Sequence, residues 1–206
     1  TIEKILQKKL IHKYPKQPYD KPLFKTPGPR KQFRYLLKTG FYVLKRIFLK
    51  LARKRIDWNV AYQYKKNWND AALWNAQVIK NPPNRFLADP FLVYRENKHY
   101  CFVEDYCYKK RKGVISAYEI TKKGAIELGI AIEEKFHLSY PFLFESKGDL
   151  YMSPETGQAN DIRIYKCTEF PLKWKFEKIL IPNISARDTS IFKKDSRWWL
   201  LTNIDT

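Results

Sequence analysis

The sequence predicts an all-β protein, a β-propeller that is incomplete in this chain, with a basic helix before it. Two observations predict this fold: an internal repeat of about fifty residues, and further strand patterns that bring each repeat to four strands. The chain has 206 residues, of which 44% are hydrophobic and 16% aromatic, so a packed domain is expected rather than disorder. We expect a basic linker and amphipathic helix over residues 1–56, followed by the partial propeller over residues 57–206.

The repeat consists of three segments that align without gaps. They are "DPFLVYRENKHYCFVE" from Asp89, "YPFLFESKGDLYMSPE" from Tyr140 and "DTSIFKKDSRWWLLTN" from Asp188. Each segment predicts a β-hairpin, because an apolar strand is followed by a short polar loop and a second strand rich in aromatic residues. Four-residue loops result if three pairs of residues face each other: Tyr94 and His99, Glu145 and Leu150, and Lys193 and Trp198.

The segments between these hairpins supply the other strands. "GVISAYEI" and "AIELGIAIEE" follow the first hairpin, and "DIRIYKC" and "KWKFEKILI" follow the second. Four antiparallel strands at this period are typical of a propeller blade. "WNVAYQY" and "LWNAQVI", before the first repeat, predict strands of a closing or partial blade. A β-sandwich is the alternative, but it does not explain the gapless alignment. Since a propeller needs at least four blades, we expect this chain to be a piece of a longer protein.

The predicted pairing places polar residues together at the end of each hairpin away from its loop. In this register three pairs face each other: Asp89 and Glu104, Tyr140 and Glu155, and Asp188 and Asn203. Inner strands of successive blades would bring these ends to one rim of the propeller. His137 and Arg187 lie just before two of these pairs in the sequence and are expected at the same rim.

Clustered carboxylates raise one another's pKa and can share acid and base roles, and glycoside hydrolysis uses two of them. The candidate catalytic residues are therefore Asp89, Glu155 and Asp188, and the candidate substrate-binding residues are Glu104, His137, Tyr140, Arg163 and Arg187. The alternative is structural: each aspartate caps the turn before its strand, His137 fixes a loop, and Arg163 lies on a blade surface. No phosphate-binding glycine loop or nucleophile elbow is present, and we expect no cofactor.

The net charge of +19 is concentrated in the N-terminal segment. Residues 1–57 hold 17 Lys/Arg and 3 Asp/Glu, whereas the rest of the chain holds 23 and 18. Residues 14–30 contain five prolines and predict an extended linker. The following segment, residues 31–55, predicts a helix with one apolar face formed by Leu37, Phe41, Leu44, Phe48 and Leu51.

Two interpretations of this helix stay open. It binds an anionic membrane surface through residues 34–55, or it docks on a neighbouring domain with its lysines in solvent. Nucleic acid is a disfavoured partner, because the predicted propeller lacks the basic excess and no nucleic-acid-binding motif is present.

The cysteines, the histidines and the apolar stretches indicate whether the chain binds a metal and where in the cell it is located. Cys101, Cys107 and Cys167 are odd in number and lack metal-ligand spacing, and the three histidines are scattered. No secretion signal follows Thr1, and charged residues interrupt the longest apolar stretch. We therefore expect no metal site and a cytoplasmic location, peripheral to the membrane if the helix binds lipid.

Several ordered motifs resemble one known family. They are "WNVAYQY", "FLADPF", "FVEDY", "FHLSYPFLFE", "YMSPET", "FPLKW" and "DTSIF…RWWLLTN". Over about residues 57–206 they resemble the N-terminal domain of plant glucosamine inositolphosphorylceramide transferase and its bacterial relatives, some of which carry a formyltransferase-like domain. The family is similar to five-bladed propellers of the arabinanase and invertase type. That resemblance implies that Asp89 is the first strand-opening aspartate of a catalytic set, with Asp188 and Glu155 as further matches.

The resemblance also implies a function. In the plant family, glycosyl transfer is attributed to a separate C-terminal domain, so we expect a carbohydrate-recognition or accessory domain in a glycan- or glycolipid-synthesising protein. Its expected partners are a glycan, nucleotide-sugar or glycolipid ligand and additional domains of the same protein. Two alternatives remain: a glycosidase-like or sugar-transferring enzyme that uses the rim carboxylates, and a membrane-docking structural module.

Overall fold

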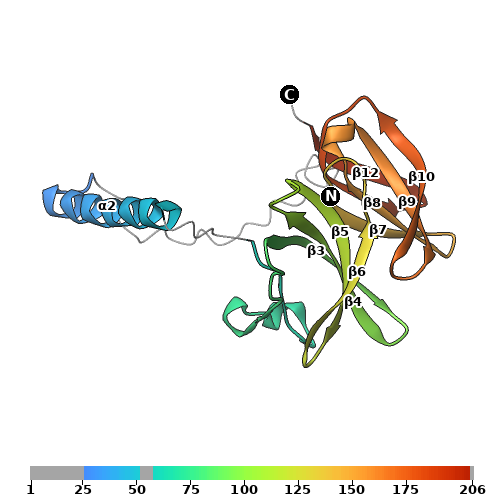
Figure 1. Cartoon of the computed structure of the whole chain (residues 1–206), viewed down its shortest axis with the longest axis horizontal. Coiled ribbons are helices and arrows are strands. Elements are labelled where there is room, and N and C mark those ends of the chain that lie inside the picture. The colour runs from blue at the N-terminus through green and yellow to red at the C-terminus, as the bar shows by residue number, and fades with distance from the viewer. Residues whose placement is uncertain (1–25, 52–57, 205–206) are drawn as a thin grey trace, which may run out of the picture. The chain divides into compact units, whose positions relative to one another are not determined.

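The computed structural model describes residues 26–51 and 58–204 (Figure 1). The chain divides into two compact units, residues 1–56 and 57–206. In the first unit the described residues form one long helix, α2 (Pro29–Leu51), which is preceded by residues 26–28, in neither helix nor strand. The helix therefore begins inside the segment predicted as a linker, because proline is well tolerated in the first turn of a helix. The rest of the predicted linker before residue 26, and the predicted helical residues 52–55, lie outside the described residues.

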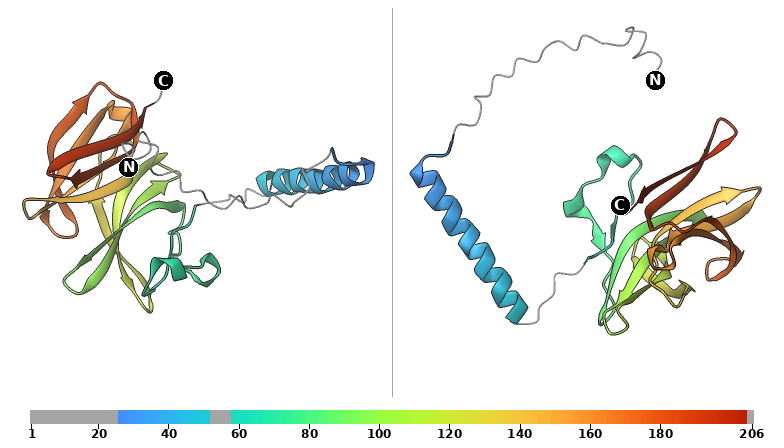
Figure 2. Two further views of the ribbon diagram at one scale, coloured as in Figure 1. Left: turned by 180° about the vertical axis from the view of Figure 1, so that it is seen from behind. Right: turned by 90° about the horizontal axis from the view of Figure 1, so that it is seen from above.

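The second unit is built from antiparallel sheets that follow one another along the chain (Figures 1 and 2). The first sheet contains β3 (Arg85–Arg95), β4 (Lys98–Cys107), β5 (Lys112–Thr121) and β6 (Gly124–Ile132). The second contains β7 (Ser139–Ser146), β8 (Asp149–Glu155), β9 (Asp161–Glu169) and β10 (Lys173–Pro182). The hairpin of β11 (Ala186–Lys194) and β12 (Arg197–Ile204) comes last. Strands that are consecutive in sequence are neighbours in each sheet, so the predicted propeller blades are confirmed as two four-stranded units and the first hairpin of a third.

The segment before the first blade forms much less sheet than predicted. Its two strands, β1 (Ala61–Tyr62) and β2 (Gln77–Val78), have two residues each and pair with each other. Between them lie two short 3₁₀ helices, η1 (Trp68–Asp70) and η2 (Leu73–Asn75). A third, η3 (Gly157–Ala159), connects β8 to β9. Val60 and Ile79, which lie next to this short ladder, are nearly inaccessible to solvent. The apolar patterns therefore predicted longer strands than the two residue pairs observed.

The loops of the three repeated hairpins are tighter than predicted. The expected pairs, such as Tyr94 with His99, are present in each hairpin, but every ladder continues by one further pair. Only two residues remain in each turn, and all have positive φ: Glu96 and Asn97, Lys147 and Gly148, and Asp195 and Ser196. Positive φ at both central residues is the geometry of a type I′ turn, which matches the right-handed twist of the two strands.

The predicted pairing near the start of each hairpin is wrong by one residue. Ala88 rather than Asp89 faces Glu104, Ser139 rather than Tyr140 faces Glu155, and Arg187 rather than Asp188 faces Asn203. The cause is a β-bulge, in which one strand contains an extra residue that does not join the ladder. In all three hairpins a residue of the bulge has positive φ: 48° at Asp89, 45° at Tyr140 and 52° at Asp188.

The core lies mainly between the first two blades. The principal cluster contains buried side chains from both sheets and from the segment that connects them: Phe102, Ile115, Leu138, Met152 and Tyr165. A second cluster packs the first blade against the segment before it, through Val60, Ile79, Leu87, Val103 and Tyr118. Leu87 and Leu138, which belong to these two clusters, each lie two residues before a bulge residue, Asp89 and Tyr140 respectively.

Candidate functional site

The bulges bring residues of consecutive blades into direct contact. The Asp89 carboxylate, on β3, accepts a hydrogen bond from the backbone N–H of Tyr140 on β7 at 3.2 Å. The Glu155 carboxylate, on β8, accepts one from the N–H of Asp188 on β11 at 3.3 Å. In both cases a carboxylate of one blade binds the bulge residue of the next blade. The hydroxyl of Tyr140 lies 3.3 Å from that of Ser190, which adds a second contact to the third hairpin.

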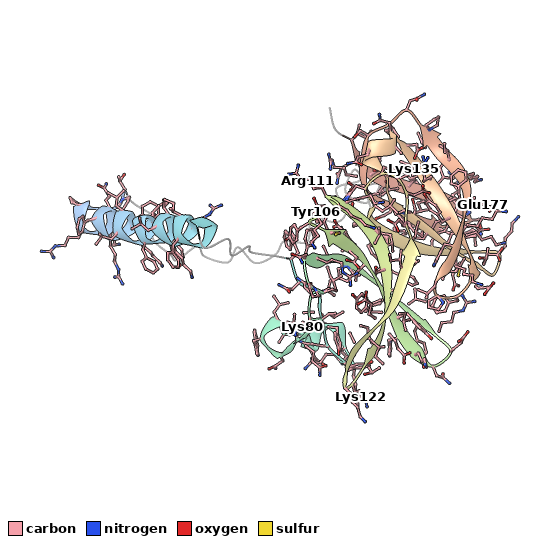
Figure 3. All side chains as sticks on the ribbon, viewed as in Figure 1. Lys80, Tyr106, Arg111, Lys122, Lys135 and Glu177 are labelled. Carbon is pink, nitrogen blue, oxygen red and sulfur yellow. The ribbon has the colours of Figure 1, made fainter. Side chains whose placement is uncertain are left out.

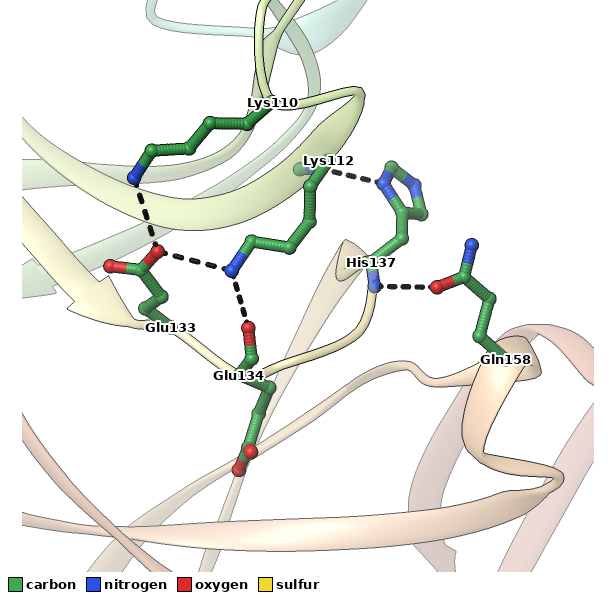
Figure 4. Close-up of polar contacts among 7 residues, drawn as sticks. Lys110, Lys112, Glu133, Glu134, His137 and Gln158 are labelled. Carbon is green, nitrogen blue, oxygen red and sulfur yellow. Dashed lines mark hydrogen bonds and ion pairs between the residues drawn. The ribbon is translucent and has the colours of Figure 1, made fainter.

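Glu104 and His137 form the centre of the site. Glu104 is buried in β4, and its Oε1 lies 3.5 Å from His137 Nε2. The other ring nitrogen, Nδ1, accepts a hydrogen bond from the backbone N–H of Gly113 at 2.8 Å, and the His137 N–H donates to Gln158 at 3.0 Å (Figure 4). Because Nδ1 is an acceptor, the neutral imidazole carries its proton on Nε2, which faces Glu104.

Burial and mutual repulsion shift the pKa values of the ionisable side chains at this site. Burial, with added repulsion from Asp89 and Glu155, raises the pKa of Glu104 to about 8. Burial also raises the pKa of Asp89 and of Glu155, and the charge of Asp188 adds to both shifts. The pKa of His137 is lowered by burial. Near neutral pH the Glu104 carboxyl is therefore mainly protonated, beside a neutral imidazole.

We call the four carboxyl groups the acidic rim: Asp89, Glu104, Glu155 and Asp188. A cavity of about 480 Å³ adjoins it. Trp58, Asn59, Val60, Phe86, Ala88 and Pro90 line this cavity together with Asp89 and Glu104. The Trp58 side chain is 73% exposed, and its backbone carbonyl accepts a hydrogen bond from Asn81, whose side-chain oxygen in turn accepts the N–H of Leu87. These contacts hold the Trp58 backbone to the start of the first blade.

The other predicted site residues have separate positions. Arg187 lies beside the acidic rim, with Nη1 3.5 Å from Glu155 Oε1. Asn203 donates to the Asp188 carboxylate at 3.4 Å. The guanidinium of Arg163 is held by an ion pair with Asp161 and lies over the rings of Phe136 and Phe176. These contacts give Arg163 partners within the second blade and the segment before it.

Three residues of the site were missed by the sequence reasoning. Trp58 was assigned only to a strand, and Gln158 had no distinguishing signal. Gly113 permits the close approach of His137, because a Cβ at this position would lie 2.7 Å from His137 Cε1 and 2.5 Å from the Leu138 carbonyl oxygen. A lone glycine at the start of a predicted strand was the available signal, since glycine there often marks a close approach of another backbone.

The arrangement offers hydrogen-bond acceptors and a proton donor rather than a preformed metal centre. Within residues 26–51 and 58–204, no group of three or more His, Cys, Asp or Glu side chains has an arrangement that could hold a metal ion. The chemistry available from the acidic rim is hydrogen bonding to polar ligand groups and proton transfer from a neutral carboxyl.

The fold and the site define a β-propeller-type domain in which carboxylates of one blade bind the bulge residue of the next, and in which two carboxyl groups of the first blade, Asp89 and Glu104, line a cavity. The chain belongs to the family described as glucosamine inositolphosphorylceramide transferase 1, N-terminal, whose model matches residues 59–205. It is 37% identical over 123 residues to glucosamine inositolphosphorylceramide transferase 1 of Oryza sativa subsp. japonica, covering 59% of this chain and 16% of that protein. The Arabidopsis thaliana protein of the same name is 37% identical over 121 residues, which cover 58% of this chain and 16% of the relative.

Solved structures with a similar arrangement of strands are distant in sequence. An α-L-arabinofuranosidase from Lactobacillus brevis aligns with a TM-score of 0.48 and 12% identity over 65% of this chain and 52% of its own. An exo-β-1,3-galactanase from Phanerochaete chrysosporium aligns with a TM-score of 0.45 and 14% identity over 57% and 32%. The chain thus spans about a sixth of the curated plant relatives and about a third to a half of these structures.

Proposed function

We propose that this chain is a carbohydrate-recognition domain of a larger glycan- or glycolipid-modifying protein. The observation that carries the proposal is the position of Asp89 and Glu104 on a cavity that Trp58 also lines. The family supports a glycan-related role, since its plant members are named as glucosamine inositolphosphorylceramide transferases. Because the chain spans only 16% of those proteins, transfer itself is assigned to other parts of such a protein.

The residues around the cavity suit a saccharide. Carboxyl oxygens accept hydrogen bonds from hydroxyl groups, and a protonated carboxyl, such as that of Glu104 near neutral pH, can also donate one. The exposed indole of Trp58 offers an apolar surface with one N–H donor, which fits a ligand that has both apolar and polar faces. A cavity with a few convergent polar groups is the usual form of a small-molecule site.

The hydrogen bonds of the acidic rim favour binding over catalysis. Asp89 and Glu155 each accept a backbone N–H from the next blade, so both carboxylates also maintain the contact between blades. A catalytic nucleophile or base needs an oxygen directed at the substrate. Glu104 accepts no backbone hydrogen bond that would compete with a ligand among the contacts described above, and it is the rim carboxyl best suited to direct contact.

The second candidate is a glycosidase-like or sugar-transferring enzyme. The pKa of Glu104, raised to about 8, favours this alternative, because a carboxyl that stays protonated near neutral pH can act as a general acid. Asp89 or Glu155 would then supply the second carboxylate that glycoside chemistry requires. This candidate differs from the first in requiring turnover of the saccharide.

A ligand screen on the full 206-residue chain separates the two candidates. Wild type, Asp89→Asn and Glu104→Gln are tested on an array of glycans and by calorimetry with nucleotide sugars. Asparagine tolerates the positive φ of Asp89, so Asp89→Asn keeps the backbone of the bulge. The matched controls are Asp195→Asn and Glu96→Gln, which make the same chemical changes at exposed turn residues with positive φ.

Recognition predicts a saccharide that binds wild type and both controls but binds the two rim variants at least about tenfold more weakly. Turnover of that saccharide or of its activated glycoside, lost in Glu104→Gln, would replace recognition by the enzymatic alternative. Binding that is equal in the rim variants and in the controls would remove the acidic rim from the account.

A further inference from the structure

The long helix α2 presents an apolar face that no described residue of its own unit covers. Every large apolar side chain described along it is about half exposed or more, from 49% at Ile47 to 69% at Phe48. At 100° per residue, most of these side chains occupy one continuous face. The members of that face are Phe33, Leu36, Leu37, Phe41, Val43, Leu44, Ile47 and Phe48.

The opposite face of α2 is strongly basic. Residues 29–51 contain seven Lys/Arg and no Asp or Glu. Lys31, Lys38, Lys45 and Arg46 lie away from the apolar face, whereas Arg34 lies at its border, next to Phe41. The helix thus lacks the i,i+4 acidic–basic pairs that commonly stabilise a solvent-exposed helix.

This combination selects one kind of partner. A helix with an apolar face, a cationic polar face and no acidic residue matches the boundary between lipid headgroups and acyl chains. Among the described residues, no helix is both long and apolar enough to cross a bilayer, so the apolar face indicates a helix lying in the plane of a membrane. We propose that α2 binds an anionic phospholipid surface with its apolar face towards the acyl chains.

The charge complementarity distinguishes this proposal from docking on a protein. Anionic lipid attracts each Lys or Arg of the polar face without a specific geometry, and the attraction falls within a Debye length. Apolar burial adds to it and does not depend on salt. Binding should therefore require both anionic lipid and the apolar face, and it should weaken as salt is raised towards about 1 M, where the Debye length is about 3 Å.

The test is co-sedimentation of the full 206-residue chain with vesicles. One set contains phosphatidylcholine alone and the other phosphatidylcholine mixed with phosphatidylserine. The charge variant is Lys38→Glu with Lys45→Glu, and the apolar variant is Phe41→Ser with Phe48→Ser. The matched charge control is Lys80→Glu with Lys122→Glu, which changes the net charge equally at exposed positions of the other unit (Figure 3).

Wild type and the Lys80/Lys122 control are expected to bind the phosphatidylserine vesicles and to bind neutral vesicles weakly. Each Lys near an anionic surface strengthens binding about fivefold, so the charge variant should lose at least about tenfold. The apolar variant should lose a similar factor. All variants should keep the wild-type unfolding midpoint of the propeller unit, because none changes a residue of its core.

Absence of wild-type binding to phosphatidylserine vesicles overturns the proposal. So does an equal loss in the charge variant and in the Lys80/Lys122 control, which would indicate a non-specific effect of net charge. Vesicle binding that the apolar variant leaves unchanged also overturns it, and would favour a protein partner for the apolar face.

Discussion

Glu104→Gln tests the electrostatics of the acidic rim through the pH dependence of folding. In the folded chain, burial and the charges of Asp89 and Glu155 raise the pKa of Glu104 from its usual 4.5 to about 8. A carboxyl whose pKa is raised on folding contributes stability that is complete below pH 4.5 and is lost as the pH rises through about 8. Glutamine stays neutral at every pH and cannot show this loss.

The expected magnitude follows from linkage. Each pH unit between the unfolded and folded pKa lowers the free energy of unfolding by about 1.4 kcal/mol per group. From pH 5 to pH 8 the loss is therefore about 4 kcal/mol at most, and about 2 kcal/mol if neighbouring carboxyls share half of the shift. When the pH is raised from 5 to 8, the free energy of unfolding of Glu104→Gln should therefore increase by about 2–4 kcal/mol relative to that of wild type.

The assay is urea unfolding of wild type and Glu104→Gln at pH 5 and pH 8. His137 contributes in the opposite direction, because its lowered pKa adds stability as the pH rises through 6.5. This contribution is present in both chains and largely cancels in the difference between them. Glu96→Gln, in an exposed turn, is the control and should follow wild type. Parallel pH dependence in wild type and Glu104→Gln would refute the reasoning.

Two further predictions concern the packing around the site. Gly113→Ala should lower the free energy of unfolding by about 2–3 kcal/mol, because the new Cβ would lie 2.5 Å from the Leu138 carbonyl oxygen; thermal unfolding measures it. Gly40→Ala, whose new Cβ would meet no atom within 4 Å beyond the backbone of its own helix, is its control, and an equal effect of both substitutions would contradict the close approach. Arg85→Met should lower stability by about 3 kcal/mol in urea unfolding, because it leaves the fully buried Asp105 carboxylate without its ion pair at 2.7 Å. If Arg85→Met together with Asp105→Asn were no more stable than Arg85→Met alone, the unpaired charge would not be the cause.

The blades could be predicted because alternation and turn residues are local signals. Tyr94 and His99, for example, face each other as expected from the hairpin pattern. The two-residue turns were missed because a polar loop such as "RENK" does not mark where the last pair forms. Positive φ at Glu96 and Asn97 permits the tighter turn, and asparagine tolerates positive φ better than most residues.

The bulges were missed because a gapless alignment cannot show which residue leaves the ladder. An available signal was proline directly after Asp89 and after Tyr140, since proline cannot donate a ladder hydrogen bond and is often found at bulges. The predicted rim residues still lie at the same end of each hairpin, because the bulge shifts the pairing by only one residue. Trp58 could not be recognised as part of the site, since its proximity to Glu104 depends on how the segment before the first blade packs.

The central claim, that the acidic rim binds saccharide, is tested most directly by NMR titration of the 206-residue chain with a glycan found in the screen. The account predicts the largest chemical-shift changes at the backbone amides of Tyr140 and Asp188, whose N–H groups are bound by Asp89 and Glu155, and at the indole N–H of Trp58. Shifts confined to other surfaces, with these three signals unchanged at saturation, would contradict it.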